Sequence, residues 1–274
     1  MTSVTGTGDK ASLGAFLAGN PFPGPFTDGL FFRDKMRALH RIAPDTPVAD
    51  LLEIGGGQSG LSAMLYPKAR IVNLDINGQL AAACCNQHSR VRFVQGDAAA
   101  LPFPDAHFDM VTMFDLLEHV LDDRAVARET LRVLRPGGWI LMSTPDQDRW
   151  RYPYYRVFKP LCPREETLLA EWGHVRRGYT QDELDALFGA PAQRTASFIN
   201  PLLAFSHDVS FSTLSPRRRL LLHILLAPVS MLGWLAHRLA APGTEIAAAW
   251  RKAPEADGDP HAKPGVKLRG ISSR

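Results

Sequence analysis

The sequence has few cysteines and no recognisable metal-binding spacing. Cys84, Cys85 and Cys162 are its only cysteines among 274 residues. No C-x-x-C pair occurs, which argues against a zinc site or a redox motif. None of the nine histidines belongs to an H-E-x-x-H or H-x-x-x-H arrangement. We therefore expect no metal centre, and a sparse, odd-numbered set of cysteines is typical of the reducing cytoplasm.

Strong charge and an obvious leader are also lacking. The formal net charge of +3 is too small to indicate nucleic acid as a partner. The first ten residues, MTSVTGTGDK, lack the charged-then-apolar order of a signal peptide. Proline and glycine are dense over residues 20–29, so we expect residues 1–28 to be disordered or irregular. The expected location is the cytoplasm, either free or in association with a membrane.

One strongly apolar run lies near the C-terminus. Residues 220–236 follow three consecutive arginines, and a run of this length is at the short limit for a membrane span. We favour a helix that lies on a membrane interface through residues 217–238, with the arginines facing anionic lipid. Packing on the rest of the chain or in a homodimer, or a true span, are the alternatives. We assign residues 213–250 to this apolar helical segment and residues 251–274 to a disordered basic tail.

The central part alternates strand-like and helix-like segments. The expected strands are 48–54, 70–74, 91–95, 108–114 and 139–143, and the expected helices are 29–42, 60–66, 78–87, 122–134 and 180–188. This alternation predicts an α/β fold in which helices cover both faces of a parallel sheet. Residues 145–178 break the rhythm just after a strand. They are rich in arginine, aromatic residues and proline, and we interpret them as a lid or substrate insertion.

The most informative stretch is VADLLEIGGGQSGLSAML, residues 48–65. It predicts a buried strand, a glycine turn and the start of a helix, with glycines in the spacing G-x-G-x-x-G. Glu53 lies two residues before the first of them, Gly55. A pyrophosphate at the turn would be repelled by this carboxylate, whereas an ammonium would be attracted. The alternative is that Glu53 only caps a backbone amide.

Acidic residues follow the next two strands. Asp75 ends the strand IVNLD, where a carboxylate suits hydrogen bonds to both hydroxyls of a ribose. Asp97 follows the strand VRFVQ, where a carboxylate can accept a hydrogen bond from an exocyclic amine such as that of adenine. Either residue can instead serve a local turn. The stretch LRVLRPGGWILMSTP then predicts a helix, a Pro-Gly-Gly turn and another strand.

In this order and spacing, the sequence resembles the class I S-adenosylmethionine-dependent methyltransferases, especially the group that modifies small molecules, quinones and lipids. The resemblance rests on LLEIGGGQSG, NLD, GDAAALPFPDAHFDMV, FDLLEHVLD and LRVLRPGG, and it covers roughly residues 45–145. It implies a Rossmann-like, doubly wound, mostly parallel seven-stranded sheet with a reversed final hairpin. It also implies that the cofactor lies across the carboxyl ends of the strands. We assign residues 29–212 to this domain.

The resemblance and the acids together suggest a set of binding residues and two catalytic candidates. The residues expected to bind S-adenosylmethionine are Glu53, Gly55, Gly56, Gly57, Gly60, Asp75, Ile76, Asp97, Ala98, Phe114 and Leu116. His119 and His174 are candidates for a general base because the imidazole pKa lies near neutrality. The alternative for His119 is that it organises the loop with Glu118.

These observations favour a methyltransferase that acts on a hydrophobic small-molecule or lipid-type acceptor, with the apolar C-terminal segment pointing to the membrane face as its place of action. Sulfonium chemistry needs no metal, because the methyl donor is already activated and catalysis is largely proximity and orientation. Two alternatives stay open: a nicotinamide-dependent oxidoreductase on a related fold, and a non-catalytic relative that binds the cofactor.

Overall fold

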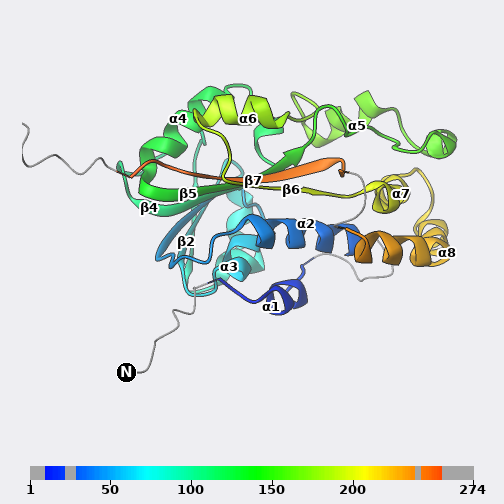
Figure 1. The fold of residues 1–274 in the computed structure, drawn as a ribbon, viewed down its shortest axis with the longest axis horizontal. Helices are drawn as coiled ribbons and strands as arrows, with labels where there is room; N and C mark the ends of the chain where they lie inside the picture. Colours follow the sequence, from blue (N-terminus) through cyan, green and yellow to red (C-terminus); the bar gives the residue numbers. More distant parts are fainter. Residues whose placement is uncertain (1–9, 22–28, 238–241, 255–274) are drawn as a thin grey trace, which may run out of the picture.

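A seven-stranded sheet forms the centre of the molecule (Figure 1). The computed structural model describes residues 10–21, 29–237 and 242–254. The strands are β1 (Asp50–Ile54), β2 (Arg70–Asp75), β3 (Val91–Gln95), β4 (Phe108–Phe114), β5 (Leu134–Pro145), β6 (Arg194–Phe198) and β7 (Glu245–Arg251), in the order β3-β2-β1-β4-β5-β7-β6. β7 runs antiparallel to its neighbours β5 and β6, and the other pairs are parallel. The expected mostly parallel sheet with a reversed hairpin is confirmed.

Helices cover both faces of the sheet, as Figure 1 shows. On one face lie α1 (Leu13–Ala18), α2 (Gly29–Ile42) and α3 (Leu61–Leu65), and on the other lie α4 (Asp123–Val133) and α6 (Gln181–Phe188). Successive strand residues point to opposite faces, so Leu51 packs on the α2 side while Leu52 packs on the α4 side. The central strands are therefore apolar without alternation, because both of their faces are buried.

Two expectations need correction, the disordered or irregular segment over residues 1–28 and the helix over residues 78–87. The N-terminal region contains a short helix, α1, whose first turn is capped when the Ser12 side chain accepts a hydrogen bond from the Ala15 amide. The expected helix over 78–87 is two 3₁₀ helices, η1 (Gly78–Ala82) and η2 (Cys84–Gln87), with extended backbone between them at Ala83. The side chain of Asn86 explains the break, because it donates to the carbonyls of Leu80 and Gly57 and draws this segment toward the glycine turn. Residues 1–9 and 22–28 lie outside the described residues.

The expected helical segment over 213–250 is wrong in its last part. Helix α7 (Pro201–Ser210) is followed by α8 (Pro216–Leu235), but residues Glu245–Arg251 form strand β7, inside the sheet. The sequence EIAAAWR is rich in alanine and lacks polar alternation because β7 is buried on both faces between β5 and β6. A short apolar run of this kind does not distinguish a buried strand from a buried helix. Most of the expected basic tail, 255–274, lies outside the described residues.

The insertion after β5 contains the 3₁₀ helix η4 (Arg156–Leu161) and then helix α5 (Glu165–Trp172). A short 3₁₀ helix, η3 (Leu117–His119), follows β4. The next helix, α6, begins with the expected capping box between Thr180 and Glu183. In Figure 1, α5, α7 and α8 all lie beyond the end of the sheet where β5 ends and β7 begins. The three helices α5, α7 and α8 therefore gather at one end of the sheet.

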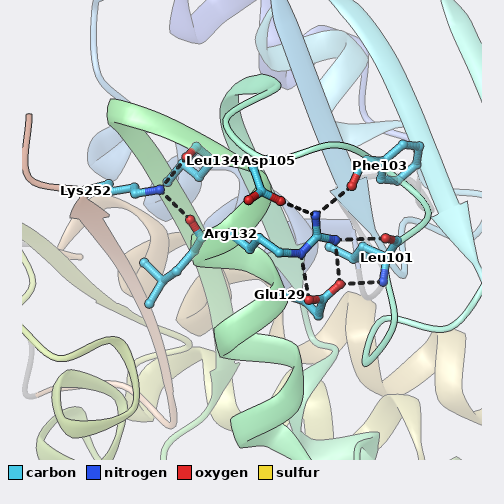
Figure 2. A network of polar contacts seen from close by, with 8 residues as sticks. Leu101, Phe103, Asp105, Glu129, Arg132, Leu134 and Lys252 are labelled. Atoms are coloured by element: carbon cyan, nitrogen blue, oxygen red, sulfur yellow. Dashed lines mark hydrogen bonds and ion pairs between the residues drawn. The ribbon is translucent and has the colours of Figure 1, made fainter. Parts of the chain in front are cut away.

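Arg132 on α4 holds the loop that follows β3 (Figure 2). Its guanidinium donates to the carboxylates of Glu129 and Asp105 and to the carbonyls of Leu101 and Phe103, at 2.7–2.9 Å. Glu129 in turn accepts a hydrogen bond from the Leu101 amide. Because this loop begins with Gly96 and Asp97, the network fixes the far end of the segment that carries the third predicted acid.

Candidate active site

Hydrogen bonds to residues at and after the end of β2 fix the conformation of the glycine turn. Gly55 has φ 69°, a left-handed conformation that residues with a side chain rarely adopt, and a Cβ there would lie 2.6 Å from Cδ1 of Leu116. The Gly57 amide donates to Asp75 Oδ2 at 3.2 Å. The Gly57 carbonyl accepts from the side-chain amides of Asn73 and Asn86. The turn between β1 and α3 is thus tied to the end of β2.

Glu53 lies beneath this turn and is 2% exposed. Its Oε1 has no hydrogen-bond partner among the described residues. Burial raises the pKa of Glu53 to about 7, against hydrogen bonds from Ser62 that lower it. A Cβ on Gly56 would lie 2.6 Å from the Glu53 carboxyl carbon, so the carboxyl group is pressed against the turn. The site therefore holds a buried acid with unused acceptor capacity.

A cavity of about 610 Å³, the loop cavity, lies where the loops after β1, β2, β3 and β4 meet. Of the residues expected to bind the cofactor, it brings together Gly55, Asp75, Ile76, Asp97, Ala98 and Leu116, and it also includes His119. No lysine or arginine lines it among the described residues. Gly56 and Phe114 line a bridging cavity of about 380 Å³ that shares Gly55 and Asp115 with the loop cavity. Glu53, Gly57 and Gly60 line neither of these two cavities.

A third cavity, of about 410 Å³, has aromatic walls, and we call it the aromatic cavity. It shares Asp115 and His119 with the loop cavity. Its remaining lining residues come from α2, the loop after β4, the end of β5, the insertion, α7 with its C-cap, and β7: Phe31, Phe32, Glu118, Pro145, Trp150, Trp172, His174, His207, Phe211 and Glu245. Two cavities that share a wall could hold two reactants side by side.

Carboxyl groups gather where these cavities meet. Asp115 has φ 51°, a left-handed conformation that aspartate tolerates better than most residues, and it accepts a hydrogen bond from the Ser143 hydroxyl at 2.7 Å. Burial disfavours its charge, but the Lys35 ammonium, with which it forms an ion pair, lowers the pKa of Asp115 below its usual value. Glu118 accepts a hydrogen bond from Thr144, and burial, together with the Asp115 charge, raises the pKa of Glu118 to about 8.

The comparisons with known proteins agree with this geometry. Residues 52–142 match the family model described as a methyltransferase domain. A probable S-adenosylmethionine-dependent methyltransferase of Mycolicibacterium smegmatis is 34% identical over 126 residues, which are 46% of this chain and 49% of that protein. A ubiquinone/menaquinone biosynthesis C-methyltransferase of Shewanella frigidimarina is 31% identical over 143 residues, 47% of this chain and 57% of that protein. The chain thus spans about half the length of these curated relatives.

The protein has a class I S-adenosylmethionine-dependent methyltransferase domain. The crystal structure of the N-methyltransferase NodS from Bradyrhizobium japonicum, in complex with S-adenosyl-L-homocysteine, has the same fold, with a TM-score of 0.52. It is 16% identical, and the match covers 89% of this chain and 98% of that one. The family match and the curated relatives set aside the nicotinamide-dependent oxidoreductase that the glycine turn alone left open.

The residues of this methyltransferase domain fit its cofactor. The unpartnered Oε1 of Glu53 beneath the turn suits an ammonium nearby, and the lack of lysine and arginine among the described residues of the loop cavity suits a ligand without phosphate. Asp75 and Asp97 also accept local hydrogen bonds, from the Asn77 and Ala99 amides, at 2.9 and 2.8 Å. A carboxylate has about four acceptor positions, so these turns leave capacity for a ligand.

The two histidines of the methyltransferase domain that were considered as bases lie together. Their ring centroids are 4.5 Å apart, and His119 lines both the loop and the aromatic cavity while His174 lines only the aromatic cavity of these two. Burial, together with His119, lowers the pKa of His174 to about 4, so its imidazole is neutral at physiological pH. Glu118, His119 and His174 offer ligand atoms within 4.8 Å of one another, a grouping that their sequence spacing does not reveal.

Sequence reasoning missed three charged residues of this domain's site. Asp115 follows β4 just as Asp75 and Asp97 follow β2 and β3, and that repeated position was the available signal. Lys35 lies on α2, 80 residues before its partner Asp115, and Glu245 begins a strand that was expected to be helical. Neither had a local signal, because both reach the site only through the packing of the sheet.

Proposed function

We propose that the protein transfers the methyl group of S-adenosylmethionine to a hydrophobic small-molecule or lipid-type acceptor. The observation that carries this proposal is the shared wall between the loop cavity and the aromatic cavity, formed by Asp115 and His119. An acceptor between the aromatic walls would lie directly beside a cofactor in the loop cavity. The name of the Shewanella relative, a C-methyltransferase of quinone biosynthesis, supports an apolar acceptor of moderate size.

In this proposal the chain binds and orients both reactants. Asp75 would accept hydrogen bonds from the ribose hydroxyls, Asp97 would accept one from the adenine amine, and Glu53 would attract the ammonium end. When bound, the cofactor supplies an activated methyl group on a positively charged sulfur. The remaining task is to align the acceptor and exclude water, which the apolar walls of the aromatic cavity suit.

We further propose that α8 brings the protein to a membrane surface. Among the described residues, α8 is the one helix that is long and apolar enough to cross a membrane by length and composition, and only 17% of its apolar window is buried. Its burial pattern is inverted: His223, Ser230 and Gly233 face α7 and the rest of the protein, whereas leucines such as Leu221 and Leu225 are exposed. This pattern suits a helix lying on lipid, with the exposed Arg217 and Arg218 facing anionic headgroups, whereas Arg219 donates a hydrogen bond to the Ser210 carbonyl.

The inward face of α8 explains why it stays with the domain. A Cβ on Gly233 would lie 2.8 Å from Cβ of Leu202, so only glycine allows this approach of α8 to α7. Asn200 donates a hydrogen bond to the Gly233 carbonyl at 2.9 Å. The guanidinium of Arg37 stacks 3.8 Å above the ring of Trp234. These contacts favour a helix fixed on the domain, at the same edge as the aromatic cavity, over one that leaves it to span a bilayer.

The experiment that tests the catalytic proposal is transfer of a methyl label. The protein is incubated with methyl-labelled S-adenosylmethionine and with separate lipid and polar-metabolite extracts, and calorimetry measures cofactor binding in parallel. We expect label in an organic-extractable product. Cofactor binding without transfer to any fraction would instead indicate a non-catalytic cofactor-binding protein, and label confined to polar products would contradict the apolar acceptor.

A further inference from the structure

Glu245 has a buried carboxyl group that lacks a hydrogen-bond partner among the described residues. It is the first residue of β7, it is 9% exposed, and it lines the aromatic cavity. No described residue donates a hydrogen bond to its side chain, although its backbone pairs with Pro145 and Phe198 in the sheet. Buried carboxyl groups are normally paired, because an unpaired one is costly. A ligand in the cavity is the partner that this geometry leaves room for.

The surroundings of Glu245 disfavour its charged form, because burial and the negative charge of Asp115 raise its pKa. Asp115 is paired with Lys35, and Glu118 accepts a hydrogen bond from Thr144. No lysine or arginine lines the aromatic cavity among the described residues. Burial lowers the pKa of both His174 and His207 to about 4, so these two wall residues bring no positive charge at neutral pH. The described walls of the cavity therefore bring no cation of their own to Glu245, and a bound ammonium group would stabilise its charged form.

The walls of the cavity suit a cation with an apolar body. Trp172 is 4.8 Å from Phe211 and 6.2 Å from Trp150, measured between ring centroids, and Phe31 and Phe211 are 6.5 Å apart. Aromatic faces attract ammonium groups and also bury apolar carbon. A hydroxyl group could donate a hydrogen bond to Glu245 but would bring no charge to balance a carboxylate.

We propose that the acceptor is an amine with an apolar body, and that the Glu245 carboxylate binds its ammonium group in the aromatic cavity. This inference rests on the proposed function. The Glu245 carboxylate takes one proton from the ammonium and becomes a carboxylic acid, leaving a neutral amine. The nitrogen lone pair then forms the bond to the methyl carbon while the carbon–sulfur bond breaks, its electron pair staying on sulfur. The product leaves as a methylated ammonium, and Glu245 returns its proton to solvent.

Calorimetric titration of the full chain with 3-phenylpropylamine and with its uncharged analogue 3-phenylpropan-1-ol tests the proposal. We expect the amine to bind about tenfold more tightly than the alcohol, the effect of one charge-assisted hydrogen bond. Glu245→Gln should remove this preference while the alcohol binds as before. Glu166→Gln, an exposed change of the same kind on α5, should keep it. Equal affinities in the unmodified protein, or a preference that survives Glu245→Gln, would overturn the proposal.

A second variant and a second readout test the amine acceptor separately from the proposed methyltransferase function. Trp172→Leu removes an aromatic wall without touching β7, and it should weaken the amine more than the alcohol. In the label-transfer experiment, the labelled product should be retained on a cation exchanger at neutral pH, and a neutral labelled product would contradict the amine. Loss of S-adenosylmethionine binding would count against the proposed function instead, since the probe titrations do not depend on it.

Discussion

The Lys35 ammonium on α2 is ion-paired with the carboxylate of Asp115, the residue that lines all three cavities of the site. Asp115 is held from two further directions, because the Ser143 hydroxyl donates to its carboxylate and its own amide donates to the Ser143 carbonyl at 2.9 Å. The pair joins a helix on one face of the sheet to the carboxyl ends of β4 and β5. The central wall of the site thus depends on α2, which precedes the glycine turn in sequence.

Replacing the cation of this pair should destabilise the protein. Lys35→Met leaves the Asp115 carboxylate without its partner, and we expect a loss of about 2 kcal/mol in the free energy of unfolding, less than for a fully buried pair because Asp115 is partly exposed. The double variant Lys35→Met/Asp115→Asn should recover at least half of that loss, since no unpaired charge remains. Denaturant unfolding at pH 7 measures both. Strictly additive effects of the two single changes would show that the pair is not coupled.

Removing the acid at the end of β2 should weaken cofactor binding. Asp75→Ala deletes the proposed acceptor for the ribose and also the acceptor of the Gly57 amide, so both a ligand contact and the shape of the turn are lost. We expect the dissociation constant for S-adenosylmethionine, measured by calorimetry, to rise at least about tenfold. Asp148→Ala, at an exposed position in the loop after β5, is the matched control. An unchanged constant in Asp75→Ala would remove this residue from the cofactor site.

The buried Glu53 should make stability depend on pH. Its pKa is raised from 4.5 to about 7, so the folded chain holds its proton more tightly than the unfolded chain does. Stability is then greatest below about pH 4.5, falls as the pH rises toward 7, and changes no further above that through this group. The full loss is on the order of 3 kcal/mol.

Glu53→Gln isolates that contribution by removing the titrating group. Glu118, with a raised pKa of about 8, shifts stability in the same direction, so the wild-type curve also contains its effect. Unfolding free energies measured between pH 5 and 8 should therefore decline less steeply in Glu53→Gln than in the wild type. Parallel curves for the two proteins would mean that Glu53 does not titrate in this range.

A charge on the exposed face of α8 should reduce membrane binding. Leu225 is 64% exposed, and Leu225→Lys replaces apolar surface that would enter the lipid interface. Sedimentation with anionic vesicles should show partitioning weakened by about tenfold, the value of burying one leucine. Ser89→Lys adds the same charge at an exposed position in the β2–β3 connection, at the opposite edge of the sheet, and should not weaken binding. Equal partitioning of the wild type and Leu225→Lys would contradict the docking role of α8.

The sequence by itself determined the five parallel strands of the sheet and the glycine turn after the first of them. Apolar runs separated by helical periods predict parallel strands, and the glycines from 55 to 60 with Asp75 and Asp97 mark the carboxyl ends of three successive strands. Those signals are local: each depends on a strand, a turn and the residue that follows it. For that reason they survive in a single sequence, and the structure brings Gly55, Asp75 and Asp97 into one cavity.

The tertiary structure alone decided what lies on the other side of the site. The aromatic cavity is built from α2, the insertion after β5, α7 and β7, segments separated by up to some two hundred residues, and it depends on how helices stack beyond the sheet. Glu245 reaches this cavity only because β7 inserts between β5 and β6, and Lys35 reaches Asp115 only because α2 packs on the sheet. The pairing of strands from distant segments is determined by the burial of both faces of the sheet. The alanine-rich sequence of β7 does not indicate which strands it pairs with.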